Sequence, residues 1–138
     1  MNIFKEIINK NIHAHIVWED ESFLAFLDVN PIAMGHTLLI PKREVDYIFD
    51  LDDNEYTELF LRAKMLAPIL KEAFSCKRVA IAVEGFGVPH THVHLVPVNQ
   101  GNELNPQNAK SASKSNLEKA QKKIRDQISL LSRNEELR

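Results

Sequence analysis

The segment PHTHVHLV, residues 89–96, places three histidines at alternate positions, separated by Thr91 and Val93. Side chains alternate across a β-strand, so His90, His92 and His94 are expected to project from one face of a strand over residues 90–98. Three adjacent imidazolium ions would repel one another, so the row is expected to be at least partly neutral near pH 7. Because perturbed titratable groups gather at functional sites, idle surface histidines are the less favoured interpretation.

Two kinds of chemistry fit such a row. In the first, two imidazoles of a His-x-His pair bind zinc or a related ion, with His36 or Glu84 as a further ligand. In the second, a neutral imidazole attacks phosphorus without a metal while its neighbours stabilise charge. The spacing of the histidines alone leaves both interpretations open.

Outward from this segment, the pattern predicts an α+β fold with a mainly antiparallel sheet. Five strands are expected over residues 15–18, 22–27, 36–40, 78–83 and 90–98. Asn2 is expected to cap a short helix that ends near Asn9, and Asp52 with Glu55 forms a capping box for a long helix. The apolar positions of that long helix repeat at helical spacing; they are Tyr56, Leu59, Phe60, Ala63, Leu66, Ala67, Leu70 and Phe74.

A polar loop over residues 99–113 precedes a predicted C-terminal helix. Ser115 and Glu118 have the spacing of a capping box, and the tail 132–138 is expected to fray. The apolar stripe predicted for this helix consists of Leu117, Ala120, Ile124, Ile128 and Leu131. We expect residues 1–98 to form the core, and residues 99–138 to belong to the same single domain.

Composition limits the classes of function. The 138 residues carry a formal net charge of −2, which argues against a dedicated binder of nucleic acid or of anionic membranes. Cys76 is the only cysteine, so neither an internal disulfide nor a multi-thiolate zinc site is available. No signal peptide or membrane-spanning run of about 20 apolar residues is present, and we expect a cytoplasmic protein.

The string HTHVHLV resembles the signature of the histidine-triad (HIT) superfamily, in which three histidines alternate with hydrophobic residues. The block IVWEDESFLAFLDVNPIAMGHTLLIPKREV, residues 16–45, is similar to the strand–turn–strand–loop–strand block of the same family. The resemblance implies a HIT-like fold: a five-stranded antiparallel sheet with a long packed helix, followed here by a C-terminal helix. It also implies a homodimer and a nucleotide as the small-molecule substrate, with no cofactor.

The resemblance assigns roles to residues of this chain. His92 matches the nucleophile that carries the nucleotidyl group, and His94 matches the histidine that contacts the phosphate oxygens. His90 and His36 match the pair whose hydrogen bonds orient this row. Asp28 matches the residue that accepts hydrogen bonds from the ribose hydroxyls, although a turn residue before Asn30-Pro31 is its simpler interpretation. The wall of the base and ribose pocket is matched by Phe26, Leu27 and Val29.

The chain departs from the family pattern in two places. Some relatives hold a structural zinc with two cysteines and two histidines; one of these ligands is the first triad histidine, and Asn2, Lys5 and Glu44 stand at the other three positions. We therefore predict no metal. Before the triad, relatives have a longer glycine-rich loop whose last residues contact the phosphate or leaving group, whereas this chain has the shorter segment 84–89.

The favoured function is cleavage at the α-phosphate of a nucleoside 5′-monophosphate conjugate, of phosphoramidate or adenylate type, through a nucleotidyl-histidine. The alternative within the family is hydrolysis of dinucleoside polyphosphates. Two alternatives of another class are a metal-binding histidine site and a nucleotide-binding regulatory protein. A metal site would lose activity with a chelator, and a regulatory protein would bind nucleotide without turnover.

Overall fold

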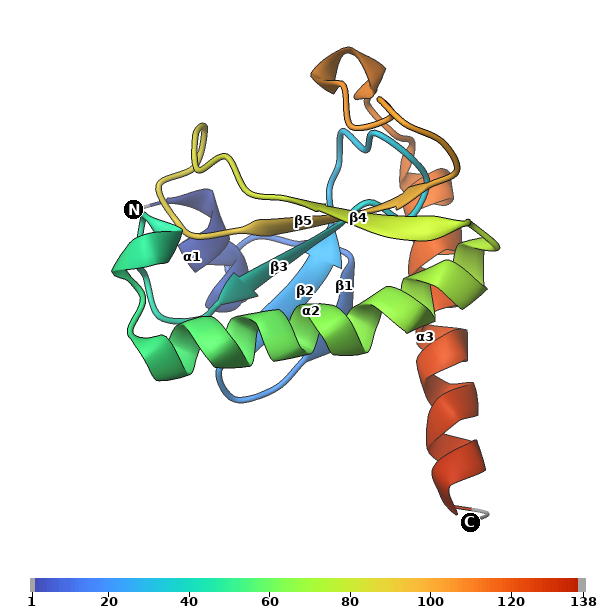
Figure 1. The fold of residues 1–138 in the computed structure, drawn as a ribbon, viewed down its shortest axis with the longest axis horizontal. Coiled ribbons are helices and arrows are strands. Elements are labelled where there is room, and N and C mark those ends of the chain that lie inside the picture. Colours follow the sequence, from blue (N-terminus) through green and yellow to red (C-terminus); the bar gives the residue numbers. More distant parts are fainter. Residues whose placement is uncertain (1, 137–138) are drawn as a thin grey trace.

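The sheet predicted from the sequence is present in the computed structural model, which describes residues 2–136 (Figure 1). Its strands are β1 (Ile16–Glu19), β2 (Phe23–Leu27), β3 (Thr37–Pro41), β4 (Arg78–Ala82) and β5 (Val93–Val98). They lie in the order β1-β2-β3-β5-β4, and every neighbouring pair is antiparallel. The α+β fold with a five-stranded antiparallel sheet is therefore confirmed.

The fifth strand begins three residues later than the alternation predicts. β3 pairs with β5 only from Val93 onward, and the backbone N–H of Thr91 instead donates to the carbonyl of Val45, at 2.7 Å. The imidazole of His90 donates to the carbonyl of Pro41, at 2.7 Å, at the end of β3. Side-chain and loop hydrogen bonds thus take the place of ladder bonds, and of the three histidines only His94 stands on the strand.

Helix α1 (Ile3–Ile8) covers one face of the sheet. The Asn2 side chain caps it by accepting a hydrogen bond from the N–H of Lys5, at 2.7 Å, as predicted. The buried residues of this layer are Phe4, Ile7, Leu24, Phe26, Leu38 and Ile40. Their burial fixes α1 beside the segment that carries His90 and His92.

The opposite face is covered by α2 (Asp53–Phe74) and contacted by α3 (Lys114–Glu136), whose lower part extends away from the sheet in Figure 1. The capping contact of α2 is the predicted one, since the Asp52 carboxylate accepts from the N–H of Glu55 at 2.7 Å. The larger core includes Leu39, Leu59, Ala63, Leu66, Leu70, Val93, Leu95, Leu117, Ala120 and Ile124.

Three expectations for the C-terminal helix are wrong. The side chain that caps α3 is Ser113, whose hydroxyl accepts from the N–H of Asn116 at 3.1 Å, so the helix begins before Ser115. Leu131 is exposed because the helix has passed beyond the sheet by that point. The helix also continues to Glu136 instead of fraying from residue 132; residues 137–138 lie outside the described part.

The segment between β5 and α3 is attached to the loop that follows β2. This segment contains the short 3₁₀ turn Pro106–Asn108, and another such turn, Ile48–Asp50, precedes α2. After Asn108 the chain runs beside residues 29–31. The N–H of Lys110 donates to Pro31 at 3.2 Å and that of Ala112 donates to Val29 at 3.0 Å. These bonds position the loop that leads to His36.

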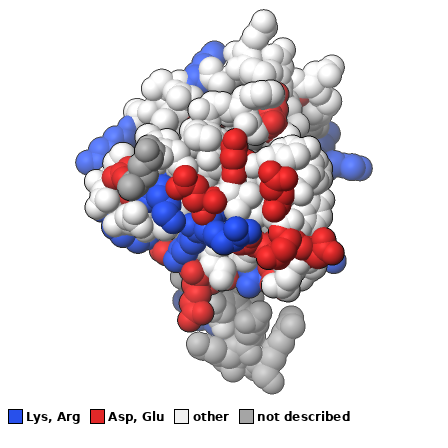
Figure 2. Space-filling model, turned by 90° about the vertical axis from the view of Figure 1, so that its left-hand side faces the viewer, with Lys and Arg blue, Asp and Glu red and all other residues white. Residues whose placement is uncertain are grey.

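Charges of both signs are mixed on the surface. Figure 2 shows Lys and Arg side chains in a band with Asp and Glu around it, and no extended basic patch on that face. Paired groups include Arg43 with Glu55, at 2.6 Å, and Lys42 with Glu19, at 2.7 Å. None of the described helices is long and apolar enough to cross a membrane.

Candidate functional site: a cleft beside two neutral histidines

A cleft of about 490 Å³ lies on the sheet face that α1 covers, and we call it the histidine cleft. His92 and His94 line it, together with four other predicted site residues, Phe26, Leu27, Asp28 and Val29. His90 is fully buried next to the cleft, and His36, the residue before β3, contacts His94. The structure therefore brings together residues that are up to 68 positions apart in the sequence (26 to 94).

The hydrogen bonds of His92 fix which ring nitrogen carries the hydrogen. Its Nδ1 lies 2.6 Å from the carbonyl oxygen of His90, and a carbonyl only accepts, so Nδ1 is the donor. In the neutral ring Nε2 is then left with a free lone pair. Nε2 of His92 has no hydrogen-bond partner among the described residues. The one buried side-chain atom without a partner in this part of the chain is Nε2 of His15, so Nε2 of His92 is accessible to solvent. The ring packs against Phe4, with centroids 5.1 Å apart.

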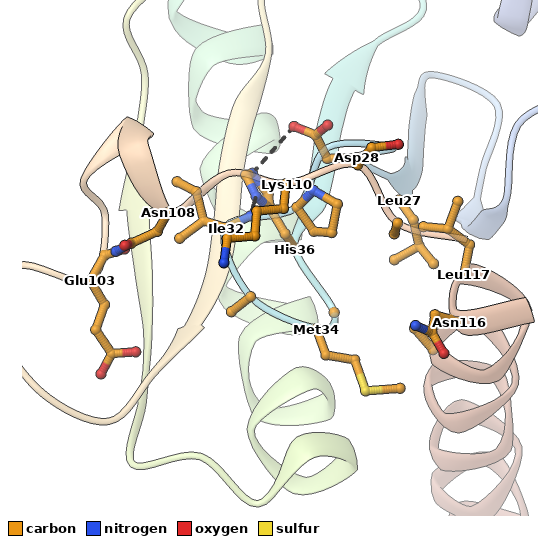
Figure 3. A pocket seen from close by; sticks show the side chains of 16 residues that line it. Leu27, Asp28, Ile32, Met34, His36, Glu103, Asn108, Lys110, Asn116 and Leu117 are labelled. Atoms are coloured by element: carbon orange, nitrogen blue, oxygen red, sulfur yellow. Dashed lines mark hydrogen bonds and ion pairs between the residues drawn. The ribbon is translucent and has the colours of Figure 1, made fainter. Parts of the chain in front are cut away.

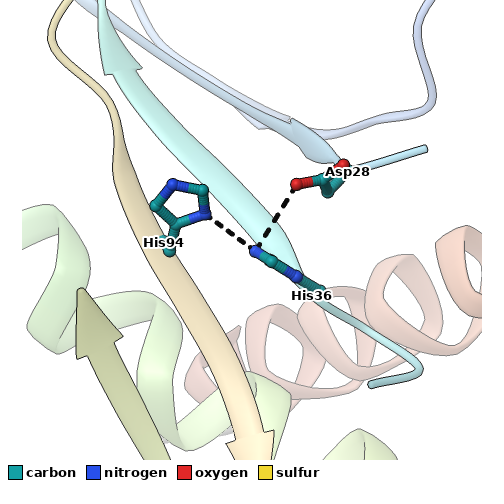
Figure 4. Close-up of side chains that lie close together, drawn as sticks. All are labelled: Asp28, His36 and His94. Carbon is teal, nitrogen blue, oxygen red and sulfur yellow. Dashed lines mark hydrogen bonds and ion pairs between the residues drawn. The ribbon is translucent and has the colours of Figure 1, made fainter. Parts of the chain in front are cut away.

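His94 and His36 form a second chain of hydrogen bonds (Figure 4). The N–H of Ile32 donates to Nδ1 of His36 at 3.0 Å, so in the neutral ring the hydrogen of His36 is on Nε2. This Nε2 lies 2.9 Å from Nδ1 of His94, and it donates to that atom. The hydrogen of neutral His94 is consequently on Nε2. His92 and His94, whose ring centroids are 5.2 Å apart, therefore offer a lone pair and an N–H respectively.

Burial favours the uncharged form of His36, His90 and His94. Desolvation lowers the pKa of His36 to about 4, against the opposing effect of the Asp28 carboxylate, which lies 3.6 Å away. Desolvation, followed by repulsion from His92, lowers the pKa of His94. Desolvation also lowers the pKa of His90. The expectation of a partly neutral row agrees with these shifts, and its physical cause is burial more than mutual repulsion.

At the positions that match the zinc ligands of some relatives, Asn2, Lys5 and His90 make hydrogen bonds. The Asn2 amide is 3.4 Å from Nδ1 of His90 and donates to it, because Nε2 of His90 donates to Pro41. The Lys5 ammonium donates to the carbonyl of Lys42 at 3.3 Å. An amide donor and an ammonium group do not ligate zinc, so the residues present do not fit that metal.

One group of three possible metal ligands exists in the described part of the chain: Asp28, His36 and His94, with ligand atoms within 4.8 Å of one another. A cation at this position would need lone pairs on Nε2 of His36 and on Nδ1 of His94. The N–H of Ile32, however, holds the hydrogen of His36 on Nε2. The hydrogen-bond pattern therefore favours a shared proton over a metal ion between the two rings.

The other end of the histidine cleft contains the predicted nucleoside contacts. Phe26 is buried in the α1 layer, Leu27 belongs to the core on the opposite face, and Val29 is 56% exposed. Oδ1 of Asp28 accepts from the N–H of Asn30 at 2.9 Å, which is the turn contact considered for this residue. Its Oδ2 approaches His36, so Asp28 joins the loop to the histidine pair.

Sequence reasoning missed several features around the site. His13 and His15 also line the histidine cleft, with ring centroids 4.9 Å apart, and Nε2 of His15 has no partner among the described residues. A second cleft of about 590 Å³ lies between the 31–36 loop and residues 103–120 (Figure 3). His36 and Lys110 line it, but His92 does not. No spacing in the polar segment 99–113 indicates this cleft.

Comparison with known proteins gives a consistent set of matches. The HIT domain family model matches residues 9–101. An uncharacterised HIT-like protein of Methanocaldococcus jannaschii is 36% identical over 105 residues, which cover 73% of this chain and 81% of that protein. A bis(5′-nucleosyl)-tetraphosphatase of Schizosaccharomyces pombe is 31% identical over 62% of this chain and 50% of that protein. The crystal structure of a hypothetical histidine triad nucleotide-binding protein from Sulfolobus tokodaii has a TM-score of 0.84 and 31% identity, covering 94% and 93% of the two chains.

Proposed function

Because this chain belongs to the HIT domain family, we propose that it transfers the nucleotidyl group of a nucleoside 5′-monophosphate conjugate to His92 and then to water. The favoured conjugates are phosphoramidates and adenylates. The coarser assignment, a HIT-family protein related to nucleotide hydrolases, follows from the matches reported above. The chemistry at His92 and the class of substrate are the proposal.

The observation that carries this proposal is the hydrogen bond from Nδ1 of His92 to the carbonyl of His90, at 2.6 Å. In the neutral ring it leaves Nε2 with a free lone pair that is accessible from the cleft. A neutral imidazole nitrogen with a free lone pair is the form that attacks phosphorus. The alternative tautomer would present an N–H and could not attack.

His94 complements this nucleophile. Its Nε2–H can donate to a phosphate oxygen as charge develops on the transferring group. The rings lie on a strand and on a loop pinned by backbone hydrogen bonds, which favours the fixed geometry that phosphoryl transfer requires. Attack by His92 forms the N–P bond as the bond to the leaving group breaks, and water then displaces the imidazole.

Under the same proposal, the nucleoside occupies the end of the cleft around Asp28. The Asp28 carboxylate would accept hydrogen bonds from the ribose hydroxyls, and Phe26, Leu27 and Val29 would contact the ribose and base. Support comes from their position in one cleft with His92. A dinucleoside polyphosphate is the second candidate substrate, favoured by the similarity to the bis(5′-nucleosyl)-tetraphosphatase of S. pombe.

The test is the covalent intermediate. The protein is incubated with adenosine and guanosine phosphoramidates and with dinucleoside polyphosphates, quenched, and analysed by mass spectrometry for a nucleotidyl adduct on His92. His92→Asn and His92→Ala should remove the adduct while the unfolding transition stays cooperative. An adduct that persists in these variants, or turnover that a chelator abolishes, would contradict the proposal. Nucleotide binding without turnover in the parent protein would favour a regulatory role.

We also propose a homodimer, which the family resemblance implies. β4 is an edge strand with unpaired backbone groups on one side. Ile81 on this strand is 46% exposed, and Leu61 and Met65 are exposed one turn apart on α2. Sedimentation of the parent and of a Leu61→Glu/Ile81→Lys variant tests this interface; a monomeric parent would contradict it.

A further inference from the structure

The loop between β4 and β5 carries the most exposed large apolar side chain of the described residues. Phe86 is 84% exposed, although it lines the histidine cleft together with Gly87 and Val88. Figure 1 shows this loop extending beyond the sheet near α1. An aromatic ring left in water at the entrance of a cleft gains free energy when an apolar group covers it.

The backbone on both sides of Phe86 suits a side chain that adjusts to a bound group. Gly85 and Gly87 both have φ of +86°, a conformation that other residues rarely adopt. A Cβ atom built on either glycine would have no heavy atom within 4 Å. The ring therefore stands between two backbone positions that have open space beside them.

The cleft contains no cationic side chain suited to a polyphosphate. Among the described residues that line it, none is Lys or Arg, and Asp28 adds a negative charge. Burial lowers the pKa of His94, so this ring contributes a neutral N–H. Successive phosphate groups normally require cationic side chains or metal ions for charge neutralisation. The lining is suited to one phosphate group flanked by apolar parts.

We infer that Phe86 forms a leaving-group subsite that selects an amine carrying an aromatic ring and disfavours a polyphosphate. This inference rests on the proposed function, in which the nucleoside lies toward Asp28 and the phosphate lies at His92 and His94. The leaving group departs on the side of phosphorus opposite to Nε2 of His92, toward the entrance of the cleft where Phe86 stands. There its ring stacks on Phe86.

The reaction at this subsite balances with water as the only co-reactant. The Nε2–P bond forms as the P–N bond breaks, and the electron pair of that bond stays on the amine nitrogen, which takes a proton from water. A second water attacks phosphorus, loses its proton to the hydroxide left by the first step, and returns neutral His92. The products are the free amine and the nucleoside monophosphate.

The test compares leaving groups that differ by one ring. Adenosine 5′-phosphoramidates of phenethylamine and of ethylamine, and diadenosine tetraphosphate, are assayed with the parent, Phe86→Ala and Phe86→Leu. Phe49→Ala is the matched control, because Phe49 is 66% exposed but outside the cleft. The parent should prefer the phenethyl compound in kcat/KM, and Phe86→Ala should reduce this preference by between about twofold and tenfold. Phe86→Leu should give an intermediate loss, and Phe49→Ala none.

A binding experiment separates this inference from the proposed function. Calorimetry measures the dissociation constants of the same two phosphoramidates for His92→Ala, with and without Phe86→Ala. A ratio of the two constants that Phe86→Ala leaves unchanged would overturn the subsite, as would faster turnover of diadenosine tetraphosphate than of either phosphoramidate. Absence of turnover and of the His92 adduct in the parent, with the ratio still dependent on Phe86, would overturn the proposed function alone.

Discussion

Acidification should destabilise the protein through His36. The folded state holds this ring neutral, with a pKa of about 4, whereas the unfolded chain takes up a proton near pH 6.5. A depressed histidine pKa gives stability that is fully present above pH 6.5 and is lost as the pH falls toward 4. The main cause of the lowered pKa is burial of the ring. The Ile32 N–H also donates to Nδ1, so protonated His36 would place an N–H against an N–H.

The magnitude follows from the shift. A pKa lowered from 6.5 to about 4 corresponds to about 3 kcal/mol of unfolding free energy in the acid limit, of which about 2 kcal/mol is lost between pH 7 and pH 5. The ring is 2% exposed, so solvent screening reduces this value little. The lowered pKa values of His90 and His94 act in the same direction and steepen the loss.

The assay is urea unfolding of the parent and of His36→Gln at pH 5, 6, 7 and 8. Glutamine keeps one donor and one acceptor but does not titrate, so the variant should be less stable at pH 7 and should lose about 2 kcal/mol less than the parent on acidification to pH 5. Carboxylates titrate in both proteins, and the difference between the two curves isolates His36. A difference that stays constant from pH 7 to pH 5 would refute the assignment of a buried neutral ring.

Four further outcomes are expected. Gly35→Ala should cost about 1–3 kcal/mol in urea unfolding, because φ is +91° and the new Cβ would lie 2.3 Å from a ring carbon of Phe74; an unchanged midpoint would contradict this contact. Asn2→Ala should cost about 2–3 kcal/mol, from the lost cap and the unpartnered Nδ1 of His90, and Asn2→Ser about 1 kcal/mol less because serine still caps α1; equal losses in the two variants would contradict the value given to the cap, and an undiminished stability of Asn2→Ser would contradict that of the His90 bond. Asp28→Ala should lower the kcat/KM preference for ribose over 2′-deoxyribose at least about fivefold, and an unchanged preference would remove Asp28 from the ribose site. A chelator should leave turnover unchanged and excess Zn²⁺ should reduce it, since a metal ion must displace the proton between His36 and His94; activation by Zn²⁺ would reverse that argument.

Periodicity in the sequence was sufficient to predict the fold. Apolar alternation and the caps at Asn2 and Asp52 located the first four strands and the first two helices within one or two residues, because local propensity and burial agree there. The errors occur where one local contact replaces another. Thr91 bonds to Val45 instead of a strand, which delays β5, and Ser113 is the serine near the start of α3 whose hydroxyl caps it.

The sequence was sufficient to predict which residues lie together at the candidate site, but not the tautomers of its histidines. Alternation correctly placed His92 and His94 next to each other, and the family resemblance added Asp28 and His36. The tautomers depend on backbone groups of Ile32 and of the loop at His90, and no side-chain pattern encodes these contacts. Exposure of Phe86 and the unpartnered nitrogen of His15 likewise depend on tertiary packing, so a sequence pattern gives no signal for them.

The different roles proposed for His92 and His94 follow from one backbone carbonyl and one backbone amide. The His90 carbonyl accepts a hydrogen bond from Nδ1 of His92 and so keeps the hydrogen of the neutral ring on that atom. The Ile32 amide acts through His36 to place the hydrogen of neutral His94 on Nε2. Two chemically identical rings 5.2 Å apart thus differ in the group that each presents, and the proposal assigns them the roles of nucleophile and hydrogen-bond donor. Exchange of either partner would present two lone pairs, which suit a metal ion, or two N–H groups, which leave no nucleophile. The choice between transfer chemistry and metal binding therefore depends on two main-chain groups, whose hydrogen bonds the alternation of side chains does not indicate.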